Sequence, residues 1–514
     1  MLNEISDLVQ LNPLDNVAVV IRPEGLETGD PWTSGDLRGV VAMAIPSGHK
    51  IAVRAVGVGE PILKYGMPIA VATRPIQAGE HVHVHNAAMP EDHFRETSVP
   101  ITSAKESGWA DLPGTYLGYR RKGRPNGTRN YIVVAATVNC SATVVKLVCR
   151  HFQGQDLRAR GIHGIIPLTH GSGCAQTIGG GAYQTLNRTL AGSIFHPNVV
   201  GAVVIGLGCE GTTFQSICAS RSGDASWEDF PLERMDIQEC GGTGPAVAKG
   251  IELVAEMLDH LPVLEREELP VSDLRLALNC GGSDAFSGLT ANPALGVVSD
   301  ILAFKGGTVA LAEIPECHGA EGLLIQRAAS PQVREDLLRV FDWWRAYSQR
   351  HGVTLNDNLS PGNIRGGITT IVEKSLGAVA KSGSSPLTQV VDYALPVMGP
   401  GFVLMNTPGF DPVSVTGLVA GGCNLVAFTT GRGSVYGCAQ APTLKIATNS
   451  SLAARLAGDI DFDAGRVVEH GETAQVGAEI YHQLIRVASG ETTSSERLGL
   501  GWEEFVPWAI GETL

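Results

Sequence analysis

Short apolar runs that end in glycine or small polar residues recur through the middle and the last third of the chain. Ile132 to Cys140, Ile165 to Cys174, Val199 to Cys209 and Leu274 to Leu278 each have the length and composition of a buried strand. Segments with apolar residues at helical spacing lie between them, as in Ala142 to Phe152. Strands that alternate with helices predict an α/β body with largely parallel sheets.

The beginning of the chain has a different pattern. Residues 1–90 contain β-rich runs separated by turn signals at intervals of roughly eight to twelve residues, which predicts a small all-β domain. Residues 91–118 are polar, interrupted by proline and without periodicity, so they are predicted to be a linker. The charged, proline-containing segment near residues 259–272 is predicted to separate two α/β domains, 119–265 and 270–514.

Composition and charge exclude several classes of protein. The 514 residues are 44% hydrophobic and 18% charged, as expected of a globular chain that buries a core. A net charge of −14 argues against a nucleic-acid partner, because phosphate neutralisation requires a basic surface. We find no apolar run of about 18 residues and no signal peptide, so we expect a cytoplasmic protein without a membrane partner. Its ten cysteines are then expected to be reduced thiols.

Four predicted strand ends carry a cysteine: Cys140, Cys174, Cys209 and Cys280. The carboxyl ends of parallel strands lie along one edge of a sheet, so we expect these thiols to converge there on a metal. Glu210 adds a carboxylate, and such a mixed set suits iron. The alternatives are that the cysteines pack beside tight turns, or that separated sulfurs leave the metal to His and carboxylate ligands.

A row of histidines ends the predicted β domain. In an alternating strand, His81, His83 and His85 would share one face, where they would either bind a metal or lie on an exposed edge. Together with His49 and Lys50, the row predicts that the β domain borders the active site.

The motifs of the chain match those of a known family. In order along the chain, they are GHK, GEHVHVHN, GTRN, HGSGC, GLGCEG, NCGGSDAFSGLTANPALG, SPGNIRGGITTIVEKSLG and TTGRGSVYG. Together they resemble the altronate/galactarate dehydratases. The resemblance implies an N-terminal SAF (β-clip) domain, a two-part α/β catalytic body, a divalent metal that is usually iron, and loss of water from a sugar acid. GEHVHVHN is closer to the altronate branch and SDAFSG to the galactarate branch.

Dehydration of a 2,3-dihydroxy acid to a 2-keto-3-deoxy acid needs help at two points. A proton alpha to the carboxylate must be removed and a hydroxide expelled, and a bound metal stabilises the charge that develops. We expect Fe2+, with Mn2+ or an iron–sulfur cluster held by three of the thiols as alternatives. His49, Lys50 and His170 are the candidate bases.

Five residues are candidates to bind the substrate. Arg129, Lys381 and Arg432 lie in glycine- or serine-rich segments and could hold its carboxylate, with Arg432 preferred because a guanidinium binds a carboxylate in bidentate fashion. Ser283 and Asp284 lie where a helix would begin, next to exposed backbone N–H groups. Each of the cations, taken singly, could equally be a solvated surface charge.

Two other classes of function compete with the dehydratase. An NAD-dependent sugar-acid dehydrogenase is disfavoured, because the glycine-rich segment at residues 240–245 lacks the GxGxxG spacing. A non-catalytic sugar-acid-binding protein would bind the ligand without turnover. In either case we expect a small-molecule sugar acid as the partner and a homo-oligomer as the assembly.

Overall fold

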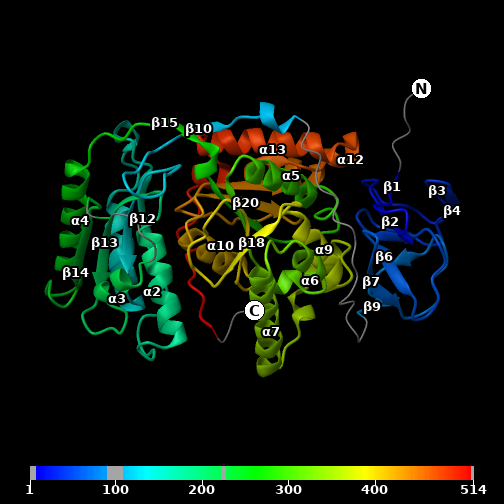
Figure 1. The fold of residues 1–514 in the computed structure, drawn as a ribbon, viewed down its shortest axis with the longest axis horizontal. Helices are drawn as coiled ribbons and strands as arrows, with labels where there is room; N and C mark the ends of the chain where they lie inside the picture. The colour runs from blue at the N-terminus through cyan, green and yellow to red at the C-terminus, as the bar shows by residue number, and fades with distance from the viewer. Residues whose placement is uncertain (1–6, 90–107, 222–226, 228, 511–514) are drawn as a thin grey trace.

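The computed structural model describes residues 7–89, 108–221, 227 and 229–510. Figure 1 shows three parts side by side, with the largest part between the other two. An all-β N-terminal domain (blue) and a four-stranded α/β domain (cyan and teal) flank a seven-stranded α/β domain (green to red). The predicted fold class is confirmed. No helix of the described residues is both long and apolar enough to cross a bilayer.

The N-terminal domain is built from short antiparallel strands around a small apolar core. The strands form a four-stranded sheet, a three-stranded sheet and a hairpin. In sheet order they are β1 (Leu8–Val9), β2 (Val17–Val20), β5 (Lys50–Ala52) and β8 (His81–Val82); β6 (Pro61–Lys64), β7 (Met67–Ala72) and β9 (Ala87–Ala88); and β3 (Pro31–Ser34) with β4 (Leu37–Val40).

The second domain is a parallel sheet with helices on both faces. Its strand order is β12 (Gly164–Leu168), β11 (Tyr131–Ala136), β13 (Val199–Gly206) and β14 (Leu232–Asp236). One face is covered by α1 (Ala142–His151) and α4 (Thr243–His260), the other by α2 (Gly181–Ile194) and α3 (Phe214–Ala219). Its strands are buried on both faces, which explains why they are continuous apolar runs.

A two-stranded ribbon marks the entry to and exit from this domain. β10 (Thr115–Gly118) pairs antiparallel with β15 (Glu267–Pro270). Of the predicted linker 91–118, residues 91–107 lie outside the described part of the chain. The remainder is not a plain linker, since it contains the 3-10 turn Trp109–Asp111 and β10. The sequence did not reveal this strand, because its partner lies about 150 residues later and no local periodicity marks it.

Seven parallel strands form the sheet of the C-terminal domain. In sheet order they are β18 (Leu387–Val391), β19 (Gly401–Met405), β17 (Thr308–Leu311), β16 (Arg275–Cys280), β20 (Leu425–Thr430), β21 (Thr443–Ala447) and β22 (Phe462–Asp463). On one face lie α5 (Ala291–Phe304), α9 (Ile371–Ala380) and α13 (Thr473–Ala488), and on the other α10 (Asp411–Ala420). Further helices are α6 (Glu321–Gln326), α7 (Pro331–His351), α8 (Pro361–Arg365), α11 (Ser450–Arg455), α12 (Arg466–His470) and α14 (Ser494–Arg497).

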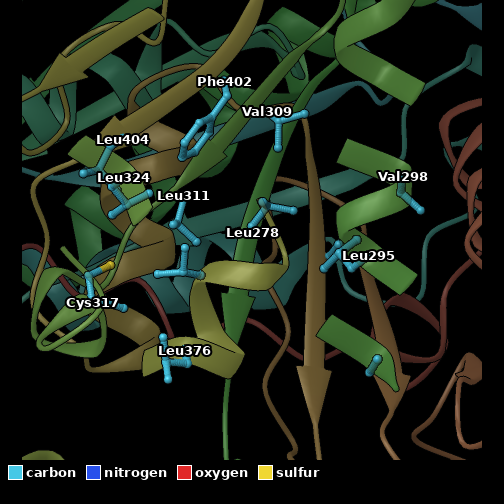
Figure 2. Close-up of a cluster of buried hydrophobic side chains, with 14 of the residues drawn as sticks. Leu278, Leu295, Val298, Val309, Leu311, Cys317, Leu324, Leu376, Phe402 and Leu404 are labelled. Atoms are coloured by element: carbon cyan, nitrogen blue, oxygen red, sulfur yellow. The ribbon is translucent and has the colours of Figure 1, made fainter. Parts of the chain in front are cut away.

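The core of this domain holds the central strands rigidly. Figure 2 shows Leu278 of β16 and Leu311 of β17 in one apolar layer with Leu295 and Val298 of α5 and Leu376 of α9. All of them are at most 6% exposed. Burial of such side chains is worth about 1.5–3 kcal/mol each, so the ends of β16 and β17 are fixed in position.

The order in which the chain adds strands to the sheet reverses at β16, although all the strands are parallel. The chain places β17 on one side of β16 and β20 on the other. The loops that follow β16 and β20 are hydrogen-bonded to each other, with the Gly431 amide 3.1 Å from the Gly282 carbonyl. In open α/β sheets, ligands bind beyond the carboxyl ends of the strands at such a reversal. A functional site is therefore expected at this edge.

Candidate functional site

A buried thiol and two buried carboxylates meet at the carboxyl edge of the seven-stranded sheet. Cys280 is the last residue of β16, and Glu313 and Glu316 follow β17. The Cys280 sulfur lies 3.2 Å from Glu316 Oε2 and 3.8 Å from Glu313 Oε2. Within the described part of the chain, these residues form the one group of at least three His, Cys, Asp or Glu whose ligand atoms all lie within 4.8 Å of one another.

Lys374 of α9 and Lys381, the residue that follows this helix, complete the buried charges. Lys374 Nζ lies 2.8 Å from Glu316 Oε1, and Lys381 Nζ lies 3.1 Å from Glu313 Oε2. The lysines are separated by about two helical turns, so they project from the same face of the helix. Both side chains are at most 7% exposed. Lys381, predicted to bind a substrate carboxylate, instead binds a carboxylate of the protein.

The cluster reaches the surface at Asp411, the first residue of α10. This side chain is half-buried, and its Oδ1 accepts a hydrogen bond of 3.1 Å from the Asn279 amide. Gly281 permits the approach, because a Cβ there would lie 2.5 Å from Asp411 Oδ2. Asp411 is therefore the carboxylate of the cluster that a ligand from solvent can contact.

Electrostatics and unsatisfied atoms mark this cluster as a site for a cation. Burial, and then the Glu316 charge, raises the pKa of Glu313 to about 8 and that of Asp411 to about 7. Glu313 Oε1 and Asn279 Oδ1 are buried without a hydrogen-bond partner in the described structure. Glu313 also has the left-handed backbone conformation, with φ of 61°, which is uncommon outside glycine and often found at functional sites.

The charges and donor types fit a divalent metal ion. When ionised, the thiol and the three carboxylates carry two more charges than the two ammonium groups can balance, and one divalent cation would make up the difference. A set of one sulfur and several oxygen ligands suits Fe2+ or Mn2+. The predicted metal ligand Cys280 thus lies in a group whose charge and donor atoms fit a divalent ion, beside Glu313 and Glu316.

The N-terminal domain is anchored next to this cluster by Lys50 and Lys64. Both ammonium groups lie 2.8 Å from Glu373 of α9, and Lys50 also donates to the Gly367 carbonyl at 2.7 Å. Burial alone would raise the pKa of Glu373, but the two ammonium groups lower it to about 2. The ammonium of Lys50 donates to Gly367 and to both oxygens of Glu373, so Lys50 holds the domains together. Burial lowers its pKa to about 8, and its assignment as a base stays a prediction.

Four histidines of the N-terminal domain gather at the same boundary. His49 Nδ1 lies 3.0 Å from His81 Nε2, and the rings of His83 and His85 lie nearby, with centroids 4.8–5.5 Å from those of His49 and His81. His49 Nε2 lies 3.3 Å from the Arg365 carbonyl, which only accepts, so Nε2 carries the proton and Nδ1 accepts from His81. Burial is the main cause that lowers the pKa of His81 to about 3 and of His83 to about 4.

The predicted strand through His81, His83 and His85 is wrong, although the three histidines do lie close together, as predicted. β8 ends at Val82, and the chain then turns, with the Asn86 side chain accepting from the His83 amide at 2.9 Å. The turn, rather than strand alternation, brings the rings together. With both nitrogens of His49 hydrogen-bonded, this residue is placed as part of the domain boundary and not as a free base.

Arg432, Ser283 and Asp284 all lie at the strand reversal. Asp284 is buried and accepts hydrogen bonds of 3.0 Å from Thr448 Oγ1 and 3.1 Å from Asn449 Nδ2, so it orders the loop. The Ser283 hydroxyl is 3.8 Å from the Cys280 sulfur. Arg432 is exposed, and its guanidinium makes no hydrogen bond to any described residue. Of the predicted substrate cations, Arg432 is therefore placed to meet a ligand.

Two further candidates have structural roles in the second domain. All the guanidinium donors of Arg129 are used by Glu496 and by the carbonyls of Thr128, Val487 and Glu491, which leaves none for a substrate. His170 accepts from the Ser172 amide at 3.2 Å and lies 3.0 Å from the Ala136 carbonyl. Burial lowers the pKa of His170 to about 4, and both of its ring nitrogens are occupied.

The other three cysteines do not share a site with Cys280. Cys140, Cys174 and Cys209 are exposed in three loops at the carboxyl edge of the four-stranded sheet, which is a different sheet. These loops do touch, since the Asn139 amide lies 3.0 Å from the Ser172 carbonyl and the Gly211 amide 3.2 Å from the Gly173 carbonyl. Topology correctly predicted that these three loops meet, but within the described part of the chain the three sulfurs do not all lie within 4.8 Å of one another, and Cys280 belongs to the other sheet.

Glu210, proposed as a fifth ligand, stabilises one of these loops. Its carboxylate accepts hydrogen bonds from the amides of Gly208 and Cys209 at 2.8 and 2.9 Å and from the Thr137 hydroxyl at 2.6 Å. Burial opposes ionisation of Glu210, yet these hydrogen bonds lower its pKa below the ordinary value. Both oxygens are already occupied, so the carboxylate acts within the protein.

Sequence reasoning missed Glu313, Glu316, Lys374, Glu373 and Asp411. Glu313 and Glu316 both lie within five residues of the end of β17. Two features of the sequence could have indicated this cluster. The glutamates come soon after a strand, and the spacing of Lys374 and Lys381 places both on one face of a helix.

Comparisons with known proteins agree with this organisation. Models of the altronate/galactarate dehydratase SAF domain, of the D-galactarate dehydratase/altronate hydrolase second domain, and of the D-galactarate/altronate dehydratase C-terminal domain match residues 6–90, 118–262 and 271–513. The chain is 34% identical to altronate dehydratase of Bacillus subtilis, over 96% of this chain and 97% of that protein.

Two relatives from Escherichia coli are similarly close. Altronate dehydratase is 35% identical, over 95% of this chain and 96% of the relative. Galactarate dehydratase (L-threo-forming) is 33% identical, over 96% of this chain and 95% of the relative. The predicted resemblance is confirmed over nearly the whole chain: the protein belongs to the altronate/galactarate dehydratase family of hydro-lyases.

Proposed function

We propose that this chain is a metal-dependent dehydratase that converts an altronate- or galactarate-like sugar acid to a 2-keto-3-deoxy acid. The observation that carries the proposal is the buried Cys280, Glu313 and Glu316 group, which has an unpartnered carboxylate oxygen and lies at the strand reversal. The relatives of matching length are named for altronate and galactarate, which gives the class of substrate.

Cys280, Glu313 and Glu316 would hold a divalent cation, Fe2+ by preference and Mn2+ as the alternative. Such an ion supplies Lewis-acid stabilisation of the negative charge that develops on the substrate carboxylate when the alpha proton leaves. Lys374 and Lys381 hold the two glutamates in position through ion pairs of 2.8 and 3.1 Å. The alternative to this ion is an iron–sulfur cluster held by three thiols, for which Cys140, Cys174 and Cys209 on adjoining loops would be the candidates.

The residues at the surface of the cluster position the substrate and move the proton. Arg432 is assigned to bind the substrate carboxylate, because it is exposed, unpaired among the described residues and next to Gly282 of the Cys280 loop. Asp411 is assigned as the acid–base group, because it is the carboxylate of the cluster that reaches the surface. The closed surroundings of Cys280, Glu313 and Lys381 keep water from the ionic contacts beneath.

The test is turnover on a panel of aldonates and aldarates with anaerobically purified protein loaded with Fe2+. The proposal predicts formation of a 2-keto-3-deoxy acid, detected as a carbonyl product, without change in nicotinamide absorbance. Asp411→Asn should retain substrate binding and lose turnover. Reduction of added NAD would support the dehydrogenase instead, and binding without turnover would support a non-catalytic binding protein.

We further propose that the active form is a homo-oligomer. Light scattering on the purified chain measures its mass directly, and a mass of about 54 kDa, that of one chain, would contradict this.

A further inference from the structure

A pocket of about 470 Å³ lies where the second domain meets the C-terminal domain. It is lined by α2, by the turn at Gly123 to Pro125, and by the loops that precede β19 and β20. Its volume is within the range of small-molecule sites, and domain boundaries are a common place for them.

This pocket is at the opposite end of the strands from the proposed active site. Arg275 lines the pocket and is the first residue of β16, whereas Cys280 is the last. The strand separates them by roughly 17 Å, at about 3.3 Å per residue. α10 makes the same connection, because it begins at Asp411 and ends at Ala420, which lines the pocket.

The described residues that line the pocket carry positive charge. Among them the charged residues are Arg124, Arg188, Arg221 and Arg275, and none of the described lining residues is Asp or Glu. Burial lowers the pKa of Arg124 to about 10 and also lowers those of Arg188 and Arg275. Asp392 and Asp273 oppose this effect at Arg188 and Arg275, but none of the four arginines forms an ion pair with a described residue. Clustered, partly dehydrated cations of this kind are unfavourable unless an anion joins them.

Several hydrogen-bond donors in the pocket lack acceptors among the described residues, although Arg124 donates to the Val199 carbonyl and Arg188 to the Thr185 hydroxyl. Arg188 Nε and Trp227 Nε1 are buried without a partner in the described structure. The guanidinium groups of Arg221 and Arg275 donate to no described residue, and neither forms an ion pair there. Unsatisfied donors of this kind cost free energy, and a ligand that brings acceptors would remove that cost.

Aromatic rings hold two of the arginines without neutralising them. The Arg124 guanidinium lies 4.9 Å from the centre of the Trp227 ring, and that of Arg221 lies 5.3 Å from the centre of the Phe195 ring. Cation–π contacts fix the position of a guanidinium while preserving its charge and its in-plane donors. The donors are therefore arranged in advance, which suits a planar or tetrahedral oxyanion.

We propose that this pocket binds an organic anion with at least two negative charges, carried by phosphate or carboxylate groups. The proposal concerns a second site and does not depend on the reaction at Asp411 and Cys280. Arg188 and Arg275 make the essential contacts, since they lie on opposite sides of the domain boundary. The anion would thus join the second domain to the C-terminal domain.

Calorimetric titration at constant ionic strength tests the proposal, with pyrophosphate and citrate as probes and chloride as the balancing anion. Wild-type protein should bind at least one of the two at millimolar concentration. Preference for pyrophosphate would indicate a phosphorylated ligand, and preference for citrate a polycarboxylate. Failure of both probes to bind would overturn the proposal.

Matched variants locate the binding. Arg188→Met and Arg275→Met keep the side-chain length and remove the charge, and each should weaken binding of the probe at least about tenfold. Arg334→Met, on the exposed face of α7, is the control and should bind as the wild type does. Without probe, Arg275→Met should unfold at no lower temperature than the wild type, because it removes an uncompensated charge. Unchanged probe affinity in both pocket variants would contradict the assignment.

Discussion

Glu373→Gln tests whether the N-terminal domain is held on α9 by buried charges. The variant keeps the size of the side chain and one oxygen acceptor but removes the negative charge that Lys50 and Lys64 share. The side chains of these three residues are at most 1% exposed, so water cannot replace the lost interaction. Two ammonium groups would then be buried without a counter-ion.

The expected cost is large because the group is fully buried. Removing one partner of a buried ion pair typically costs about 3–5 kcal/mol. Since about 1.4 kcal/mol corresponds to a factor of ten, the equilibrium constant for docking of the N-terminal domain should fall roughly a hundredfold to several-thousandfold. An exposed pair behaves differently: Arg466 and Glu479 are 38% and 37% exposed, so Glu479→Gln should cost less than about 1 kcal/mol.

Native-state hydrogen exchange measures this opening without assuming a single unfolding step for a chain of several domains. Amides of β5 and of α9 should exchange faster by the same hundredfold or more, while those of β13 in the second domain should not change. The triple variant Lys50→Met, Lys64→Met, Glu373→Met removes all the charges together and should recover most of the protection. If Glu373→Gln exchanged as slowly as Glu479→Gln, buried charge would not be what holds the domain.

Three further outcomes follow from the structure. Arg432→Lys should lower kcat/KM by about tenfold or more in steady-state kinetics on the preferred sugar acid, because the charge stays while the bidentate contact is lost; unchanged kinetics would remove Arg432 from the site. The pKa values of His81 and His83 are depressed from 6.5 to about 3 and 4, so their contribution to stability is complete above pH 6.5 and is lost as pH falls toward 4. The midpoint of thermal unfolding should accordingly drop between pH 7 and pH 5, and less so in a double His→Gln variant; equal slopes would refute this. Glu496→Gln should destabilise the protein by about 3 kcal/mol in thermal unfolding, because it leaves the guanidinium of Arg129, which is 1% exposed, without its carboxylate. Full activity per folded molecule would fit a structural role for Arg129. A raised KM in a stable variant would instead indicate that Arg129 binds the substrate.

The sequence was sufficient to predict the parallel strands and the cysteines at or after their carboxyl ends. Buried parallel strands are continuous apolar runs, and each of the four runs that ended in Cys140, Cys174, Cys209 and Cys280 is a strand of a parallel sheet or leads directly out of one. Which strands share a sheet depends on contacts between distant segments, and nothing in the runs themselves shows that β16 belongs with β20 rather than with β13.

The same limitation applies to the site. Lys50, a candidate base, and Arg129, a candidate substrate ligand, pair with Glu373 and Glu496, which lie more than 300 residues away in the chain. Whether a buried cation serves a substrate or a carboxylate of the protein is decided by that partner, which only the folded chain identifies. Arg432 does lie in an exposed loop, as the glycines on both sides of it indicate locally, and its role toward a substrate stays a prediction.

The content of bound iron in two single-cysteine variants tests the central claim most directly. Wild type, Cys280→Ala and Cys140→Ala would be purified anaerobically, loaded with Fe2+, freed of excess metal and measured for iron per chain, with circular dichroism to confirm folding. If Cys280, Glu313 and Glu316 hold the ion, Cys280→Ala loses bound iron and Cys140→Ala retains the wild-type amount. Retention of iron by Cys280→Ala together with its loss from Cys140→Ala would contradict the claim and place the metal on the second domain.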